Sequence, residues 1–174
     1  CRTMEYTVSY KETANLMVLD NEKEISSVIL DRFSALEAGA KENNSKIRIA
    51  LSGGSTPLRL FGNMLPEFRK RMHPANMEIY WGDERCVSPC QPESNYGNML
   101  EAFLHKSGIP DTSIFRMKGE EDPEKEKVRY AGLLESFEKV DGYPSFDLIF
   151  LGLGEDGHTA SLFPNRPGLL KTTE

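Results

Sequence analysis

The stretch that decides the fold is Lys46-Ile-Arg-Ile-Ala-Leu-Ser-Gly-Gly-Ser-Thr-Pro57. Its first six residues are largely apolar, which predicts a strand over 46–51. Two adjacent glycines then permit a sharp turn. Thr56 followed by Pro57 predicts an N-cap and the first turn of a helix. The order of strand, tight loop and helix is typical of a parallel α/β sheet.

Similar units follow downstream. Residues 77–81 (Met-Glu-Ile-Tyr-Trp) predict a strand, and a long polar loop over 82–93 leads to a helix over 94–105 with Ser94 as its N-cap. Asp122-Pro123 opens another helix. Residues 146–151 are nearly all apolar after Asp147, which predicts a strand buried on both faces.

Upstream, apolar residues recur at three- and four-residue spacing from Asn21 to about Ala40, which predicts an amphipathic helix. Two short apolar segments, 4–10 and 16–19, are predicted to pair as an edge hairpin. Strands that alternate with helices indicate an α/β fold with a mostly parallel sheet and helices on both faces, which is a Rossmann-like arrangement. The length of 174 residues fits a single domain over 1–174.

Composition excludes several classes of partner. Asp and Glu number 27 against 21 Lys and Arg, and no basic cluster could follow a nucleic-acid backbone, so we expect no nucleic-acid partner. No apolar run is long enough to cross a bilayer, and we expect no membrane association. An anionic small molecule stays compatible with the net charge of -6, since a few backbone amides and one Arg can form a local positive site.

The cysteines and the start of the chain bear on the compartment. Cys1, Cys86 and Cys90 are an odd number, which we interpret as free thiols in a reducing compartment. No second Cys or His pair follows at zinc-site spacing, so we expect no metal. The chain begins Cys-Arg-Thr-Met without an apolar stretch, and we expect no secretory signal and a cytoplasmic location. The sequence leaves open whether the protein is a monomer or a small homo-oligomer.

Chemistry is expected beyond the carboxyl ends of the strands, where ligands bind in such sheets. The first of three loops there contains Ser52, Gly53, Gly54, Ser55 and Thr56. Its glycines allow close approach of a ligand, and the following helix start offers free N–H groups to an anion. A phosphate fits this loop, although the loop alone is equally compatible with a plain strand-to-helix turn.

The second loop is Trp81-Gly82-Asp83-Glu84-Arg85, and Glu93-Ser94-Asn95 closes it. A run of charges is often a solvated turn. At a strand end, the same residues offer a catalytic carboxylate, Asp83, and a guanidinium, Arg85, for phosphate or oxyanion charge. Asn95 is predicted to contact the substrate.

The third loop is Gly152-Leu-Gly-Glu-Asp-Gly-His-Thr-Ala-Ser-Leu-Phe-Pro164. Its three glycines match a dinucleotide-binding pattern, which requires a helix, a second strand and an acidic residue about twenty positions on. Glu174 has roughly that offset, but no strand precedes it, so we reject that interpretation. His158 remains as a general base, with Asp156 or Asp83 to fix its tautomer. His73 and His105 lack such surroundings.

Together the three motifs resemble those of 6-phosphogluconolactonases, in residues, order and spacing. The wider superfamily contains glucosamine-6-phosphate isomerase/deaminase, in which the His motif continues into Ala-Phe-Asn-Glu-Pro. Here it continues Thr-Ala-Ser-Leu-Phe-Pro, which favours the lactonase. The resemblance implies further strand and helix units, and a basic phosphate-binding residue, beyond Glu174, so we expect the fold to lack its last units.

The resemblance implies 6-phospho-D-glucono-1,5-lactone as substrate and hydrolysis without a cofactor or metal. On this hypothesis the phosphate binds the 52–55 loop with help from Arg85, and His158 activates the attacking water. Arg85 or backbone amides stabilise the oxyanion. Two alternatives stay open: an amino-sugar phosphate isomerase/deaminase, and a non-catalytic sugar-phosphate sensor.

Overall fold

The computed structural model describes residues 2–6, 14–164 and 166. Along these residues the elements are, in order, β1 (Arg2–Tyr6), β2 (Ala14–Val18), α1 (Glu22–Glu42), β3 (Ile47–Leu51), α2 (Ser55–Arg71), η1 (Pro74–Asn76), β4 (Met77–Trp81), α3 (Asn95–Met99), η2 (Leu100–Leu104), α4 (His105–Ser107), η3 (Asp111–Ser113), α5 (Pro123–Leu134), β5 (Lys139–Val140), β6 (Tyr143–Pro144) and β7 (Leu148–Ile149).

The central sheet has the strand order β4-β3-β7, and both strand pairs are parallel, as predicted. β3 and β4 pair in register from Ile47 opposite Met77 to Leu51 opposite Trp81. β7 continues the sheet on the other side of β3. Because the strands are parallel, the three loops that follow them leave the same edge of the sheet. This arrangement is what brings the three motifs together.

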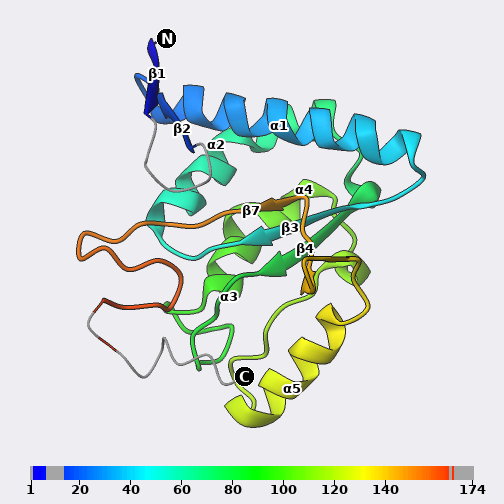
Figure 1. Cartoon of the computed structure of the whole chain (residues 1–174), viewed down its shortest axis with the longest axis vertical. Helices are drawn as coiled ribbons and strands as arrows, with labels where there is room; N and C mark the ends of the chain where they lie inside the picture. The colour runs from blue at the N-terminus through cyan, green and yellow to red at the C-terminus, as the bar shows by residue number, and fades with distance from the viewer. Residues whose placement is uncertain (1, 7–13, 165, 167–174) are drawn as a thin grey trace.

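Helices cover both faces of this sheet. α1, α2 and the α3–η2 helix pack on one face, and these helices contribute the buried rings of Phe33, Phe61, Phe68 and Phe103. On the other face, Tyr130 of α5 and the following Phe137 pack against Ala50 and Tyr80. Figure 1 shows α1 and α5 on opposite sides of the strands. The predicted α/β architecture is therefore confirmed.

The predicted helices form with small differences in their bounds. Asn21 caps α1, since its side chain accepts hydrogen bonds from the backbone N–H groups of Lys23 and Glu24. Asp122 caps α5 in the same way, and Pro123 occupies its first position. The helix predicted over 94–105 runs through α3, η2 and α4, where η2 is a π-helical turn. None of the helices built by the described residues is both long and apolar enough to cross a membrane.

The strand predicted over 146–151 is shorter and less buried than its composition suggests. Only Leu148 and Ile149 form β7, and Ile149 and Leu151 are 50% and 61% exposed. Leu148 and Phe150 are partly buried and pack against the core cluster to which α1 and α2 contribute. Among the described residues no helix covers the opposite face at Ile149, so half-buried and exposed positions alternate along 148–151. The prediction of burial on both faces was wrong.

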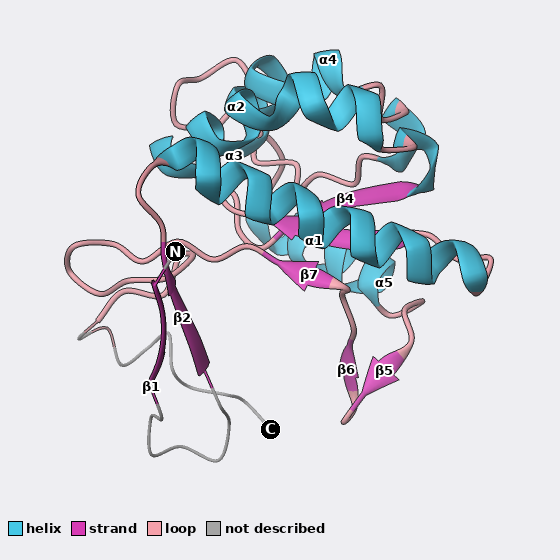
Figure 2. Ribbon diagram, turned by 90° about the horizontal axis from the view of Figure 1, so that it is seen from above, coloured by secondary structure: helices cyan, strands magenta, loops and turns pink. Residues whose placement is uncertain are grey.

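Two hairpins lie outside the central sheet. β1 and β2 pair antiparallel as a separate two-stranded sheet, so they form the predicted hairpin but do not extend the central sheet. Residues 7–10 of the predicted first strand lie outside the described residues. β5 and β6 form a second small hairpin before β7. Figure 2 shows both hairpins projecting away from the central strands.

Candidate functional site

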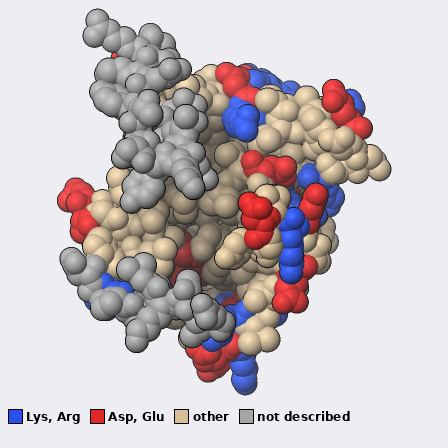
Figure 3. Space-filling view, in the orientation of Figure 1, with Lys and Arg blue, Asp and Glu red and all other residues tan. Residues whose placement is uncertain are grey.

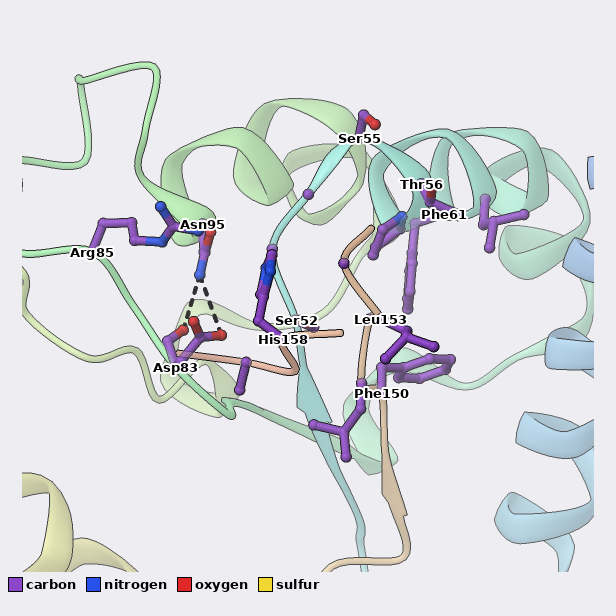
Figure 4. Close-up of a pocket in the computed structure, with 18 of the residues that line it drawn as sticks. Ser52, Ser55, Thr56, Phe61, Asp83, Arg85, Asn95, Phe150, Leu153 and His158 are labelled. Carbon is purple, nitrogen blue, oxygen red and sulfur yellow. Dashed lines mark hydrogen bonds between the residues drawn. The ribbon is translucent and has the colours of Figure 1, made fainter. Parts of the chain in front are cut away.

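The three loops at the carboxyl edge of the sheet enclose a cavity of about 490 Å³. Nine of the ten residues predicted for the site line it: Ser52, Gly53, Gly54, Ser55, Thr56, Asp83, Arg85, Asn95 and His158. The tenth, Asp156, contacts His158. Figure 4 shows Asp83, Arg85 and Asn95 grouped on one side, the start of α2 on the other, and His158 between them.

The start of α2 presents free backbone donors to this cavity. The helix begins at Ser55, and Gly54 is its N-cap residue with φ of 102°, a conformation that favours glycine. The prediction that Thr56 caps the helix was wrong, because the turn at Gly54 starts the helix two residues earlier. Gly54 has no side chain to cap the helix, so the first N–H groups of α2 are left for another acceptor.

The second loop supplies the opposite wall, where Asn95 meets the glycine-rich loop. A Cβ atom on Gly53 would lie 1.8 Å from Oδ1 of Asn95, so only glycine allows this approach. Asn95 is 7% exposed, and its Nδ2 donates to the backbone carbonyl of Asp83 at 3.1 Å. Its predicted contact with substrate stays a prediction, and the structure adds that Asn95 joins the first two loops.

Glu84 holds the second loop against helix α3, a role that the sequence analysis missed. Its carboxylate accepts hydrogen bonds from the backbone N–H groups of Asn95 at 2.7 Å and Tyr96 at 2.8 Å. It also accepts from the N–H of Arg85 at 2.7 Å. Ser94 caps the next N–H, that of Gly97, as predicted. The first N–H groups of α3 are therefore satisfied by protein groups, whereas among the described residues no side chain caps α2.

The third loop pairs His158 with Asp156. Nδ1 of His158 lies 2.5 Å from Oδ1 of Asp156, and this hydrogen bond lowers the pKa of the Asp156 carboxyl. An ionised carboxylate only accepts, so Nδ1 carries a proton, and in the neutral ring Nε2 then keeps its lone pair. A Cβ atom on Gly154 would lie 2.2 Å from His158 Nδ1, so glycine is required there. The ring also stacks on Phe163, with centroids 4.7 Å apart.

Asp83 has partners other than His158. Its Oδ2 accepts a hydrogen bond from the Ser161 hydroxyl at 2.7 Å, and its Oδ1 lies 3.5 Å from Nδ2 of Asn95. The sequence left open which carboxylate orients the imidazole, and the geometry assigns this contact to Asp156. Ser161 was not predicted as a site residue, because it contacts Asp83 from 78 positions away.

Of the described residues that line the cavity, Arg85 is the one Lys or Arg. Among the described residues, its guanidinium forms no ion pair with Asp or Glu, and its backbone N–H is fixed by Glu84. On the face shown in Figure 3, basic and acidic side chains are interspersed. The charge that an anion would meet in the cavity is therefore local and comes from Arg85 and the start of α2.

The remaining candidates for metal or acid–base chemistry lie elsewhere. Nδ1 of His73 lies 3.2 Å from Glu37, and Nε2 of His105 lies 3.4 Å from Glu101. Cys86 and Cys90 are exposed free thiols, and Cys1 lies outside the described residues. Within the described part of the chain, no group of three or more His, Cys, Asp or Glu side chains is arranged to hold a metal ion.

Comparison with known proteins gives this arrangement a family. The model of the glucosamine-6-phosphate isomerases/6-phosphogluconolactonase family matches residues 20–174. The chain belongs to this family. Among its relatives, 6-phosphogluconolactonase from Treponema pallidum is 41% identical over 118 residues, which are 67% of this chain and 49% of that protein. The enzyme of that name from Chlamydia pneumoniae is 44% identical over 121 residues, 70% of this chain and 45% of the relative.

Solved structures of the family share the fold. 6-Phosphogluconolactonase from Trypanosoma brucei is 29% identical with a TM-score of 0.70, covering 86% of this chain and 63% of that one. The Shewanella baltica 6-phosphogluconolactonase is 26% identical with a TM-score of 0.72, covering 90% and 64%. The chain spans about half the length of the curated family members that it matches.

Proposed function

We propose that this protein hydrolyses 6-phospho-D-glucono-1,5-lactone to 6-phosphogluconate. The observation that carries the proposal is the His158–Asp156 pair, at 2.5 Å, on the wall of a cavity that also contains an uncapped helix start. The His158–Asp156 pair supplies a general base, and the start of α2 supplies an anion site. The names of the family relatives support the same activity.

The phosphate group of the substrate binds at the start of α2. Of the two helices that begin at the cavity, α3 has its first N–H groups occupied by Glu84 and Ser94, whereas α2 has no side-chain cap. The positive end of the α2 dipole favours an anion there. The hydroxyls of Ser55 and Thr56 and the guanidinium of Arg85 line the same cavity and complete the set of donors.

With the phosphate held there, the lactone carbonyl faces His158. Nε2 of His158 removes a proton from water as the water oxygen attacks the carbonyl carbon. Asp156 stabilises the resulting imidazolium through Nδ1. Arg85 or backbone N–H groups stabilise the oxyanion. The tetrahedral intermediate then collapses: the bond from the carbonyl carbon to the ring oxygen breaks, and the imidazolium returns its proton to that oxygen.

Several wider predictions accompany this function. A lactone is an activated ester, so general-base catalysis by His158 suffices and no cofactor is expected. The partner is a small sugar-phosphate lactone. The cytoplasmic location, the lack of a nucleic-acid partner and the choice between a monomer and a small homo-oligomer stay predictions.

The test is hydrolysis of freshly prepared 6-phosphogluconolactone, followed by a pH-stat against the spontaneous rate. Release of ammonia from glucosamine 6-phosphate is measured in parallel. Lactone hydrolysis without ammonia release supports the proposal. Ammonia release without lactone hydrolysis indicates the isomerase/deaminase, and binding of sugar phosphates with neither reaction indicates a sensor.

A further inference from the structure

The loop that carries His158 is joined to the rest of the molecule by very few polar contacts. Its internal hydrogen bonds run from Gly154 N–H to the His158 carbonyl at 2.8 Å and from Gly157 N–H to the Gly154 carbonyl at 2.9 Å. A turn follows, closed by the two backbone bonds between Thr159 and Leu162. These bonds shape the loop but do not attach it to the sheet.

One hydrogen bond makes that attachment. Among the described residues, the Ser161 hydroxyl bond to Asp83, at 2.7 Å, is the hydrogen bond that connects residues 152–164 with the rest of the chain. Asp83 is fixed in turn, because Asn95 donates to its carbonyl and Glu84 anchors the same loop on α3. The hydroxyl therefore joins the His158 loop to the loop that Glu84 and Asn95 hold against α3.

The conformation of the turn shows that it needs support. Ala160 lies between His158 and Ser161 along the chain, lines the cavity and has φ of 49°, a left-handed conformation that is unfavourable for a residue with a Cβ atom. Such a conformation persists where surrounding contacts hold it. The Ser161–Asp83 bond supplies one such contact directly after Ala160.

We propose that Ser161 is a positioning residue for His158, and that Asp83 acts as the anchor for its hydroxyl. This inference rests on the proposed function for its kinetic consequences. Loss of the Ser161 hydroxyl loosens the turn and leaves the Asp156–His158 bond intact, so the base is present but less often in place. The phosphate site at the start of α2 is untouched by this change.

The kinetic test compares Ser161→Ala, Ser161→Thr and Asp83→Ala with the double variant Ser161→Ala/Asp83→Ala. Ser161→Ala should lower kcat between about two- and tenfold, the range for one net hydrogen bond, with KM nearly unchanged. Ser161→Thr, which keeps the hydroxyl, should restore kcat. Adding Ser161→Ala to Asp83→Ala should cause little further loss, since Asp83→Ala already removes the acceptor of the Ser161 hydroxyl. Ser136→Ala, at an exposed serine bonded to the Leu133 carbonyl of α5, is the control.

A second measurement does not depend on catalysis. Amide hydrogen exchange should be faster in Ser161→Ala than in wild type at Gly154, Gly157 and Leu162, and unchanged at Ile49 in β3. Unchanged exchange in the loop, or a kcat equal to that of wild type, would overturn the proposal for Ser161. If wild type hydrolyses no lactone but the exchange difference is present, the proposed function fails and the positioning role stands.

Discussion

Replacing Gly154 with alanine tests whether the imidazole of His158 must lie where the structure places it. A Cβ atom at position 154 would lie 2.2 Å from His158 Nδ1 and 2.9 Å from Asp156 Oδ1. Non-bonded heavy atoms rest about 3.5 Å apart, so the methyl group would displace the ring, or the backbone that carries it, by about 1 Å. A shift of that size lowers turnover by about 100-fold, or about 2.7 kcal/mol of transition-state stabilisation.

The assay is kcat for 6-phosphogluconolactone, with Gly132→Ala in α5 as the control. A Cβ atom on Gly132 meets nothing within 4 Å, and Gly132 does not line the cavity, so this variant should keep wild-type turnover. Both variants should stay folded in thermal unfolding, because neither site lies in the hydrophobic core. Wild-type turnover in Gly154→Ala, or an equal loss in Gly132→Ala, would refute the reasoning.

Three further predictions concern the scaffold. Glu84→Ala removes the acceptor for the first N–H groups of α3 and should lower the free energy of unfolding by about 1 kcal/mol in urea titrations; an equal loss in Glu93→Ala, at an exposed residue of the same loop, would contradict this role. Phe68→Ala, at a fully buried ring in contact with Phe103, should cost about 3–5 kcal/mol in the same titrations, and a loss below about 1 kcal/mol would contradict the packing. The hydrogen bond from Arg116 lowers the pKa of Glu120 from 4.5 to about 2, so the stability that this bond contributes is present above pH 4.5 and is lost as pH falls towards 2. Glu120→Gln should therefore weaken the fall of Tm between pH 4.5 and pH 2. The same dependence of Tm on pH in the variant and in wild type would count against the Arg116–Glu120 pair.

The arrangement of the site could be predicted from the sequence because the ends of the strands can be recognised where an apolar segment gives way to glycine or polar residues. Apolar segments ending at Leu51 and Trp81 placed two loops at one edge of a parallel sheet, and the third apolar segment placed the His158 loop beside them. The adjacent glycines predicted a close approach of the backbone to a ligand, and the structure shows in addition that Gly53 lies against the side chain of Asn95.

The contacts that hold the loops in place were not predictable. Glu84 caps a helix that starts eleven residues later, and Ser161 reaches Asp83 across 78 positions, so neither pair leaves a local pattern. The prediction that β7 is buried on both faces was wrong for a related reason. Apolar composition shows that a strand can be buried, but the elements packed against the strand decide which of its faces is buried. The prediction that Thr56 caps α2 was wrong because the backbone turns at Gly54, before Thr56.

The most direct test of the account is turnover by His158→Ala, measured together with binding of 6-phosphogluconate by calorimetry. The account predicts that kcat falls by about 100- to 10,000-fold, the range for a general base, while the product binds nearly as well as to wild type. His105→Ala, at an exposed histidine outside the site, should change neither quantity. Turnover retained by His158→Ala would contradict the assignment of His158 as the base.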